Sequence, residues 1–221
     1  MIKLNKKIKF KIAADGGSAS GKTTGSKLIA KKFKMRFLSS GMLYRFCALK
    51  TLQNKKIYDV KFINKVAKSI TLKKLNNKQL YNPEVARLSS IISKKPFVRK
   101  ALKNFQKNFI KKSRLVVVEG RDIGSKIMPK ADLKIFFTCS INEKAKRRLK
   151  EFKNLNNKIS LNQVKKALIQ RDNEDTKRKI SPLIMTKNAV LVDTTKLSLK
   201  QMEAKLINLV KKSIKSKYGN L

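Results

Sequence analysis

The stretch GGSASGKT (residues 16–23) matches the motif G-x-x-x-x-G-K-[ST] at every defined position. An apolar run precedes it (KFKIAAD, 9–15), and a helical pattern follows it. In this setting the backbone N–H groups cradle phosphate oxygens, Lys22 reaches the β- and γ-phosphates, and the Thr23 hydroxyl coordinates Mg²⁺. The stretch therefore predicts a P-loop with Mg²⁺ as cofactor and these ATP-binding residues: Gly16, Gly17, Ser18, Ala19, Ser20, Gly21, Lys22, Thr23 and Thr24.

The same short apolar signal recurs along the chain and alternates with helical periodicity. Further strands are expected at 114–120, 133–139 and 189–195, with a weaker candidate at 35–40. The helical pattern covers residues 22–33, 41–52, 97–111, 142–152, 161–171 and 199–214. This alternation predicts an α/β protein of the P-loop NTPase fold, with a parallel five-stranded sheet flanked by helices.

One face of the last predicted helix is apolar and is expected to pack into the core; it carries Leu199, Met202, Leu206 and Val210. Two segments leave the sheet. Residues 41–112 read as mainly helical, with a small hairpin over 70–81, and residues 153–180 are polar and charged. We expect a single domain over 1–221, with its core at 1–40, 113–152 and 181–221.

A net charge of +43 invites a nucleic-acid interpretation. However, 46 of the 56 basic residues are Lys, they are spread from end to end, and aromatic side chains are not interleaved with them. We expect no specific nucleic-acid site, only weak, salt-sensitive binding to polyanions. No apolar run approaches the ~20 residues of a membrane span. Cys47 and Cys139 lie in apolar runs, which favours a cytoplasmic protein with reduced thiols.

The ten arginines are informative because lysine suffices wherever only a solvated positive charge is needed. A planar guanidinium is required where a phosphate or a base edge must be gripped by two parallel hydrogen bonds. Histidine is absent, which excludes His-based acid–base chemistry and Ser-His triads. The site chemistry must therefore depend on Arg, Lys and a few of the 13 carboxylates.

A P-loop alone is compatible with a GTPase, an ATP-driven motor or a small-molecule kinase, so the other motifs decide. SSGMLYR (39–45) follows the second predicted strand, and EGRDIG (119–124) ends the third, where ligands of parallel sheets bind. In RDNEDTKR (171–178), a helix would place two guanidiniums beside the Asp175 carboxylate, which suits a phosphate next to a sugar hydroxyl.

These motifs resemble those of the bacterial cytidylate kinases over nearly the whole length. The segments that carry the resemblance are IAADGGSASGKTT, LSSGMLYR, EVARLSSIISKKPFVRKAL, VVVEGRDIGSKIMPKADLKIFF and QRDNEDTKRKISPL. The resemblance implies a nucleoside-monophosphate kinase fold, with 41–112 as the segment that binds the nucleotide monophosphate and 153–180 as a lid. It also implies ATP-dependent phosphorylation of CMP and dCMP. We expect the chain to act as a monomer.

Carried over residue by residue, the resemblance places Ser40, Arg45 and Arg121 at the acceptor's phosphate. Cytosine would contact Ser90, Arg99 and Asp122, while the sugar and nearby phosphate would contact Arg171, Asp175 and, from the lid, Arg178. The implied catalytic residues are Lys22, Arg121, Arg171 and Arg178.

The chain departs from the family pattern at Ser39 and Glu119, where Asp is usual, at Gly17 and Ala19 in the loop, and in a shorter segment after Asp59. The nearest alternative is a P-loop kinase of another small acceptor, such as a different nucleoside monophosphate or shikimate. A second alternative is a basic nucleic-acid-binding ATPase, which would need a clustered basic or aromatic surface.

Overall fold

A five-stranded parallel sheet organises the fold, as predicted, and the strand order in the structure is β2-β3-β1-β4-β5. The computed structural model describes residues 2, 4–56, 59–153 and 159–219. The strands are β1 (Phe10–Gly16), β2 (Arg36–Ser39), β3 (Leu115–Gly120), β4 (Leu133–Thr138) and β5 (Ala189–Asp193). Central β1 pairs with β3 on one side and β4 on the other, so that Asp15 lies opposite both Gly120 and Phe136.

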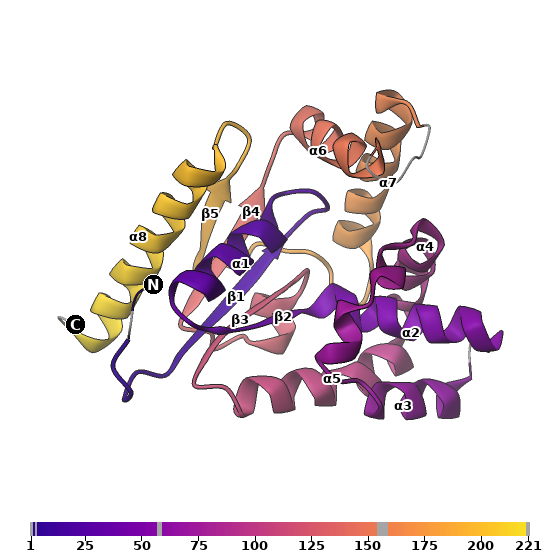
Figure 1. Ribbon diagram of the computed structural model, residues 1–221, viewed down its shortest axis with the longest axis horizontal. Coiled ribbons are helices and arrows are strands. Elements are labelled where there is room, and N and C mark those ends of the chain that lie inside the picture. Colours follow the sequence, from indigo (N-terminus) through magenta and orange to yellow (C-terminus); the bar gives the residue numbers. More distant parts are fainter. Residues whose placement is uncertain (1, 3, 57–58, 154–158, 220–221) are drawn as a thin grey trace. The chain divides into compact units, whose positions relative to one another are not determined.

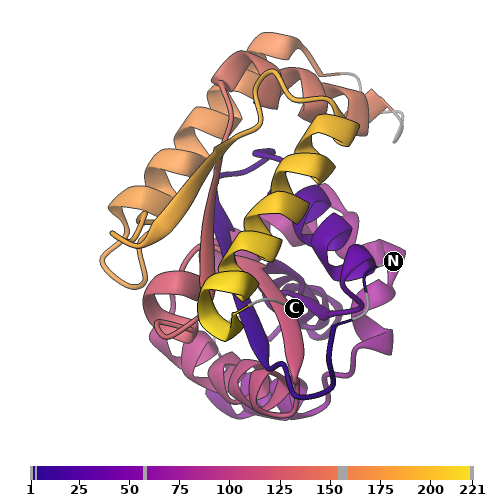
Figure 2. The same cartoon turned by 90° about the vertical axis from the view of Figure 1, so that its left-hand side faces the viewer.

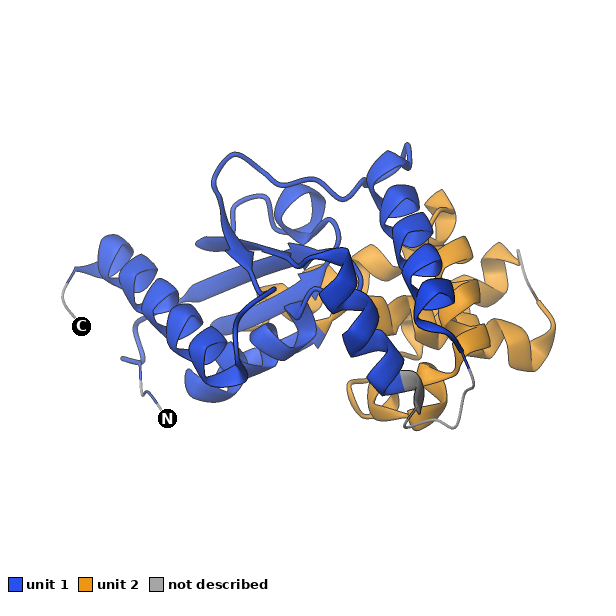
Figure 3. Ribbon diagram, turned by 90° about the horizontal axis from the view of Figure 1, so that it is seen from above, with its two compact units in different colours: residues 1–38, 114–221 blue, residues 39–113 orange. Residues whose placement is uncertain are grey.

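The chain divides into two units (Figure 3): unit 1 contains residues 1–38 and 114–221, and unit 2 contains residues 39–113. In unit 1 the helices are α1 (Lys22–Lys32), α6 (Ile141–Lys153), α7 (Leu161–Lys177) and α8 (Leu199–Tyr218). A short π-helical turn, η3 (Ile123–Ile127), follows β3.

Helices α1 and α8 pack together against the sheet (Figures 1 and 2). Alternate residues of β1, β3 and β4 face them and are almost completely buried, including Phe10, Ile12 and Phe137. Leu199 was expected on the buried face of α8, and that expectation is wrong. It is the first residue of the helix and is 65% exposed, because the buried face begins one turn later, at Met202, and continues to Ile214.

Unit 2 is helical. It contains α2 (Ser40–Asn54), α3 (Val60–Lys68), α4 (Pro83–Ile92) and α5 (Pro96–Lys111), joined in part by the 3-10 turns η1 (Lys73–Asn76) and η2 (Lys78–Tyr81). Helix α2 packs against α4, and α3 packs against α5. Helices α3 and α4 had no separate sequence prediction beyond the mainly helical character of the segment. None of the helices in the described ranges is long and apolar enough to cross a membrane.

The hairpin predicted over 70–81 is wrong, because η1 and η2 occupy that segment. A strand would place residues 70 and 72 on one face, yet Ile70 is buried and Leu72 is 40% exposed. The segment buries Ile70, Leu75 and Leu80 instead. The Asn77 side chain accepts a hydrogen bond from the Gln79 backbone N–H and so caps the second turn.

Candidate functional site

The P-loop connects the end of β1 at Gly16 to the start of α1 at Lys22. A side chain at Gly16 would place its Cβ 2.4 Å from the Phe137 carbonyl oxygen, so only glycine fits there. Gly21 takes a left-handed conformation (φ 78°) as the N-cap of α1. The loop therefore presents backbone N–H groups together with the N-terminus of a helix, an arrangement that favours anions.

Lys22 and Thr23, the two motif side chains with predicted phosphate and metal roles, share one carboxylate at the end of β3. Lys22 Nζ lies 2.8 Å from Glu119 Oε2, and the Thr23 hydroxyl lies 3.1 Å from both Glu119 oxygens. The side chains of Lys22 and Glu119 are only 9% and 4% exposed. Burial lowers the pKa of the Lys22 ammonium, and the negative charge of Glu119 opposes that shift.

Arg121, one residue beyond β3, connects the P-loop to the end of α7. Its Nε donates to Asp175 Oδ2 at 2.7 Å, and its Nη2 donates to the Ser18 hydroxyl at 3.0 Å. Arg178 Nη1 donates to the other Asp175 oxygen at 3.2 Å. Burial alone would raise the pKa of Asp175, but the guanidiniums of Arg121, Arg178 and Arg171 lower it below its ordinary value.

The arginines predicted around Asp175 are thus brought together, although not all by a helix. Helix α7 ends at Lys177, and Arg178 is its C-cap residue with extended backbone (φ −62°, ψ 138°). The guanidinium reaches Asp175 because Arg178 Nε also donates to the Ser181 carbonyl at 2.6 Å, which fixes the side chain after the helix has ended.

A second carboxylate of α7, not singled out from the sequence, contacts the P-loop itself. Asp172 Oδ1 accepts the Ser18 backbone N–H at 2.9 Å, and Asp172 Oδ2 accepts Lys144 Nζ of α6 at 2.8 Å. A Cβ at Gly17 would lie 2.7 Å from Asp172 Oδ2. The only sequence signal was its place directly after Arg171, inside the predicted lid 153–180, of which residues 154–158 lie outside the described residues.

The loop is supported from the far end of the chain by Thr194, just after β5. The Thr194 hydroxyl lies 3.0 Å from the Ser20 carbonyl oxygen, and Arg147 donates to the Thr194 hydroxyl and carbonyl oxygens at 2.9 and 2.8 Å. This support was not predicted, because Arg147 lies in a run of basic residues on α6 and resembles an ordinary surface charge.

Asp15 anchors the turn that carries Asp122. Its two carboxylate oxygens accept the backbone N–H groups of Ile123 and Gly124 at 2.8 and 2.7 Å, directly after Asp122, which is itself only 5% exposed. Burial raises the pKa of Asp15 to about 6, the two N–H groups oppose the rise, and the nearby Asp122 adds to it. Asp15 is therefore ionised at neutral pH and fixes the EGRDIG segment.

The raised pKa of Asp15 leads to a test by pH. Because the folded protein holds this proton up to about pH 6 and an unfolded Asp releases it near 3.8, Asp15 stabilises the fold less as the pH rises. The full change is roughly 3 kcal/mol, of which about 2 kcal/mol falls between pH 4.5 and 7.5. Asp15→Asn lacks this titration, and its weaker hydrogen bonds to Ile123 and Gly124 lower the free energy of unfolding by an amount that does not depend on pH.

The free energy of unfolding of Asp15→Asn, measured by denaturant relative to the unaltered chain, should therefore improve by about 2 kcal/mol from pH 4.5 to 7.5. The Asp132→Asn variant serves as the control for general pH effects, because it replaces a carboxylate that directly precedes β4 and accepts a hydrogen bond from Lys217. If the difference in free energy of unfolding between Asp15→Asn and the unaltered chain stays constant from pH 4.5 to 7.5, the pKa of Asp15 is not raised in the folded protein.

In unit 2, two predicted arginines each lie against a tyrosine and a carbonyl group. Arg45 Nη1 donates to the Leu80 carbonyl at 2.8 Å and its guanidinium lies 5.7 Å from the centre of the Tyr81 ring. Arg99 Nη1 donates to the Ser93 carbonyl at 3.0 Å. Both side chains are half-buried and held in defined positions, as a guanidinium must be to bind a ligand with two parallel hydrogen bonds.

The two predicted serines of unit 2 differ in their surroundings. Ser40, the first residue of α2, is 3% exposed and its hydroxyl accepts Gln106 Nε2 at 2.6 Å. Ser90 lies on α4, is half-buried, and its carbonyl oxygen accepts the Ser93 hydroxyl at 2.8 Å. Gln106, a buried amide of α5, was not predicted from the sequence.

The oxygen atoms of Thr23 and Glu119 are suited to Mg²⁺, which prefers hard oxygen ligands and keeps several waters and phosphate oxygens around it. Among the described residues there is no cluster of three or more His, Cys, Asp or Glu side chains that could hold a metal without a ligand's help.

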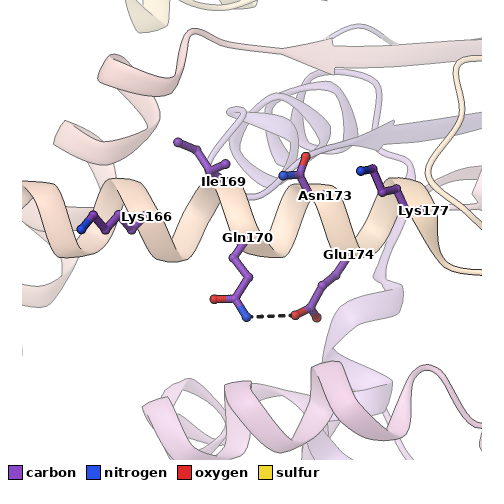
Figure 4. A pocket seen from close by; sticks show the side chains of 6 residues that line it. All are labelled: Lys166, Ile169, Gln170, Asn173, Glu174 and Lys177. Carbon is purple, nitrogen blue, oxygen red and sulfur yellow. Dashed lines mark hydrogen bonds between the residues drawn. The ribbon is translucent and has the colours of Figure 1, made fainter.

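A hollow along α7 is lined by residues other than those described above (Figure 4). Six residues of that single helix line it: Lys166, Ile169, Gln170, Asn173, Glu174 and Lys177. None of them is a predicted site residue. Its one drawn hydrogen bond joins Gln170 Nε2 to Glu174 Oε1 at 3.2 Å, within the helix.

Comparison with known proteins gives a consistent result. Residues 12–212 match the family described as "Cytidylate kinase". The cytidylate kinase of Carboxydothermus hydrogenoformans is 35% identical over 216 residues, covering 91% of this chain and 97% of that protein. The cytidylate kinase of Thermotoga neapolitana is 34% identical over 219 residues, covering 94% and 99%.

Solved structures agree on the fold. The structure of TT1252 from Thermus thermophilus aligns with a TM-score of 0.53 at 16% identity, covering 93% of this chain and 98% of that one. A shikimate kinase from Bacteroides thetaiotaomicron aligns with a TM-score of 0.50 at 11% identity, covering 91% and 98%. At these identities the likeness concerns the fold alone.

Proposed function

Since the chain belongs to the cytidylate kinase family, we propose that it transfers the γ-phosphoryl group of ATP to CMP and dCMP, which yields CDP and dCDP in pyrimidine nucleotide metabolism. The observation that carries the proposal is the family match over residues 12–212, a range that includes the P-loop, Arg121, Arg171 and Arg178. The enzyme is a phosphotransferase whose acceptor is itself a phosphate group.

The donor assignment follows from the P-loop. Residues 16–24 hold the triphosphate of ATP, with Lys22 at the β- and γ-phosphates. Lys22 is already desolvated beside Glu119, so solvent screens its interaction with the bound phosphates less than it would at an exposed site. Thr23 and the adjacent Glu119 would hold Mg²⁺, which would neutralise part of the charge on the bound phosphates.

The acceptor's phosphate is assigned to Ser40, Arg45 and Arg121. Arg171 and Arg178 add positive charge near the transferred group, and Asp175 accepts a sugar hydroxyl. The Asp175 contacts support this, because they hold the Arg121 and Arg178 guanidiniums in fixed positions.

The cytosine is assigned to Ser90, Arg99 and Asp122. A carboxylate at Asp122 can accept a hydrogen bond from the exocyclic amine of cytosine, while Arg99 and the Ser90 hydroxyl can donate to the ring nitrogen and carbonyl oxygen. UMP carries a carbonyl at the position of the amine and would set two acceptors against each other.

The transfer is an in-line displacement by an oxygen of the acceptor's phosphate. Because that oxygen is already ionised at neutral pH, the reaction needs no strong general base, which agrees with a chain that has no histidine. Positioning by Lys22 and the arginines carries the catalysis. The segment 153–180 serves as a lid that excludes water and limits ATP hydrolysis, and 41–112 binds the nucleotide monophosphate.

Phosphorylation of an acceptor panel tests the proposal. With ATP as donor, CMP and dCMP should give the highest kcat/KM among CMP, dCMP, UMP, AMP, GMP and shikimate. Faster phosphorylation of another nucleotide or of shikimate would refute the acceptor assignment while leaving the donor site intact. The family does not favour these alternatives, and the dispersed lysines do not favour a nucleic-acid-binding ATPase. We propose that the enzyme acts as a monomer in the cytoplasm.

A further inference from the structure

The P-loop already binds an anion that belongs to the protein. Ser18, the third residue of the loop motif, directs its backbone N–H to Asp172 Oδ1 at 2.9 Å. A Cβ built at Gly17 would come within 3.0 Å of both Asp172 oxygens, so the carboxylate rests directly on the backbone at Gly17 and Ser18. Backbone N–H groups of this loop are the groups that cradle phosphate oxygens in the proposed donor site.

Asp172 is held in this position from two sides. Lys144 Nζ of α6 lies 2.8 Å from Asp172 Oδ2, and their side chains are only 13% and 22% exposed. Helices α6 and α7 share a small buried cluster, and Ala19 of the P-loop packs against it. The carboxylate is therefore a fixed feature of this arrangement of α7.

A phosphate oxygen and the Asp172 carboxylate are alternatives for the Ser18 N–H. Both are anions, and two anions close together in a poorly hydrated site repel each other strongly. We propose that Asp172 is a phosphate substitute that occupies the P-loop in the absence of nucleotide and is displaced by ATP. Asp172 thereby sets the apparent affinity for the donor.

This inference rests on the assignment of ATP to the P-loop and is independent of the acceptor. If the contact between Asp172 and Ser18 is formed in about nine-tenths of the molecules, only about one-tenth can bind ATP directly, and the apparent Kd for ATP rises about tenfold. Asp172→Asn keeps the size and the acceptor oxygen but removes the charge. It should therefore lower the Kd for ATP about tenfold, a change of about 1.4 kcal/mol.

Binding to the full-length chain is measured by calorimetry with two probes, Mg²⁺-ATP and tripolyphosphate, without any acceptor present. The matched control is Glu174→Gln, which removes one negative charge from the same helix. The Glu174 carboxylate accepts a hydrogen bond from Gln170 and lines the hollow along α7. The control should leave both Kd values within about twofold of the unaltered chain. Tighter binding by Asp172→Asn alone supports the inference, whereas unchanged or weaker binding overturns it.

A double-mutant cycle with Lys144 keeps the test decisive if the single variant is poorly folded. Lys144→Met should weaken binding of both probes, because it leaves the charge of Asp172 less compensated beside the loop. Adding Asp172→Asn should restore that loss. If the double variant binds as weakly as Lys144→Met, Lys144 contacts the nucleotide directly and the inference is wrong. An unaltered chain that binds neither probe would instead refute the donor assignment.

Discussion

Replacing Lys22 by Ala should abolish measurable phosphoryl transfer, with kcat reduced by roughly 10³-fold or more. The Lys22 ammonium is the P-loop charge assigned to the β- and γ-phosphates, and it lies 2.8 Å from Glu119 Oε2 in a buried position. The measurement is a coupled assay with ATP and CMP at saturating concentrations. Near-normal turnover by a folded variant would contradict the assignment of ATP to this loop.

Lys22→Ala should also lower the free energy of unfolding. The experiment must therefore distinguish loss of catalysis from loss of folded protein. The pair with Glu119 is buried at 2.8 Å, and removing one partner of such a pair costs about 3 to 5 kcal/mol. The double variant Lys22→Met/Glu119→Gln replaces the pair with neutral groups of similar size. It should regain most of the lost free energy of unfolding but not the activity, so that loss of activity is not mistaken for loss of fold.

Asp122→Ala should lower kcat/KM for CMP far more than for UMP. Sites that hydrogen-bond a substrate group can reject an analogue lacking it by roughly 10⁴-fold. In the unaltered enzyme we expect a smaller ratio of kcat/KM for CMP over UMP, because the short segment after Asp59 leaves the base more exposed to solvent. Asp122→Asn should narrow the gap further than Ala, since its amide can donate to the UMP carbonyl.

The ratio of kcat/KM for CMP over UMP is the measured quantity, and Glu84→Gln, an exposed charge change at the start of α4, is the control that should leave it unchanged. Two outcomes would contradict the proposed role of Asp122: equal loss with both nucleotides, or an unaltered enzyme that uses UMP as well as CMP. Equal loss would point to support of the turn that Asp15 anchors.

The sheet could be predicted because buried parallel strands leave a strong local signal. The run KFKIAAD at 9–15 became β1 (Phe10–Gly16), and even the weak candidate at 35–40 became β2 (Arg36–Ser39). The errors lie where local pattern and packing disagree. Leu199 matches the helical period but precedes the buried part of α8, and the 70–81 segment mixes apolar and turn residues that fold into 3-10 turns.

The contacts that the carboxylates around the P-loop make could not be predicted, because the contacting residues are distant in the sequence. Glu119 is 96 residues from Thr23, and Asp172 is 154 residues from Ser18. The position of Asp15 and Glu119 at the carboxyl ends of neighbouring strands was a usable signal. The contact of Asp172 with the loop had none, since it depends on how α6 and α7 pack.

The hydrogen bond between Thr194 and the Ser20 carbonyl spans 174 residues of the chain. Ribosomes add about 5 to 20 residues per second, so roughly 9 to 35 s separate the synthesis of the two ends of this contact. During that interval the nascent P-loop lacks β5, Thr194 and the Arg147 contacts that depend on Thr194. The nucleotide site is therefore among the first parts of the enzyme to be translated and among the last to be completed.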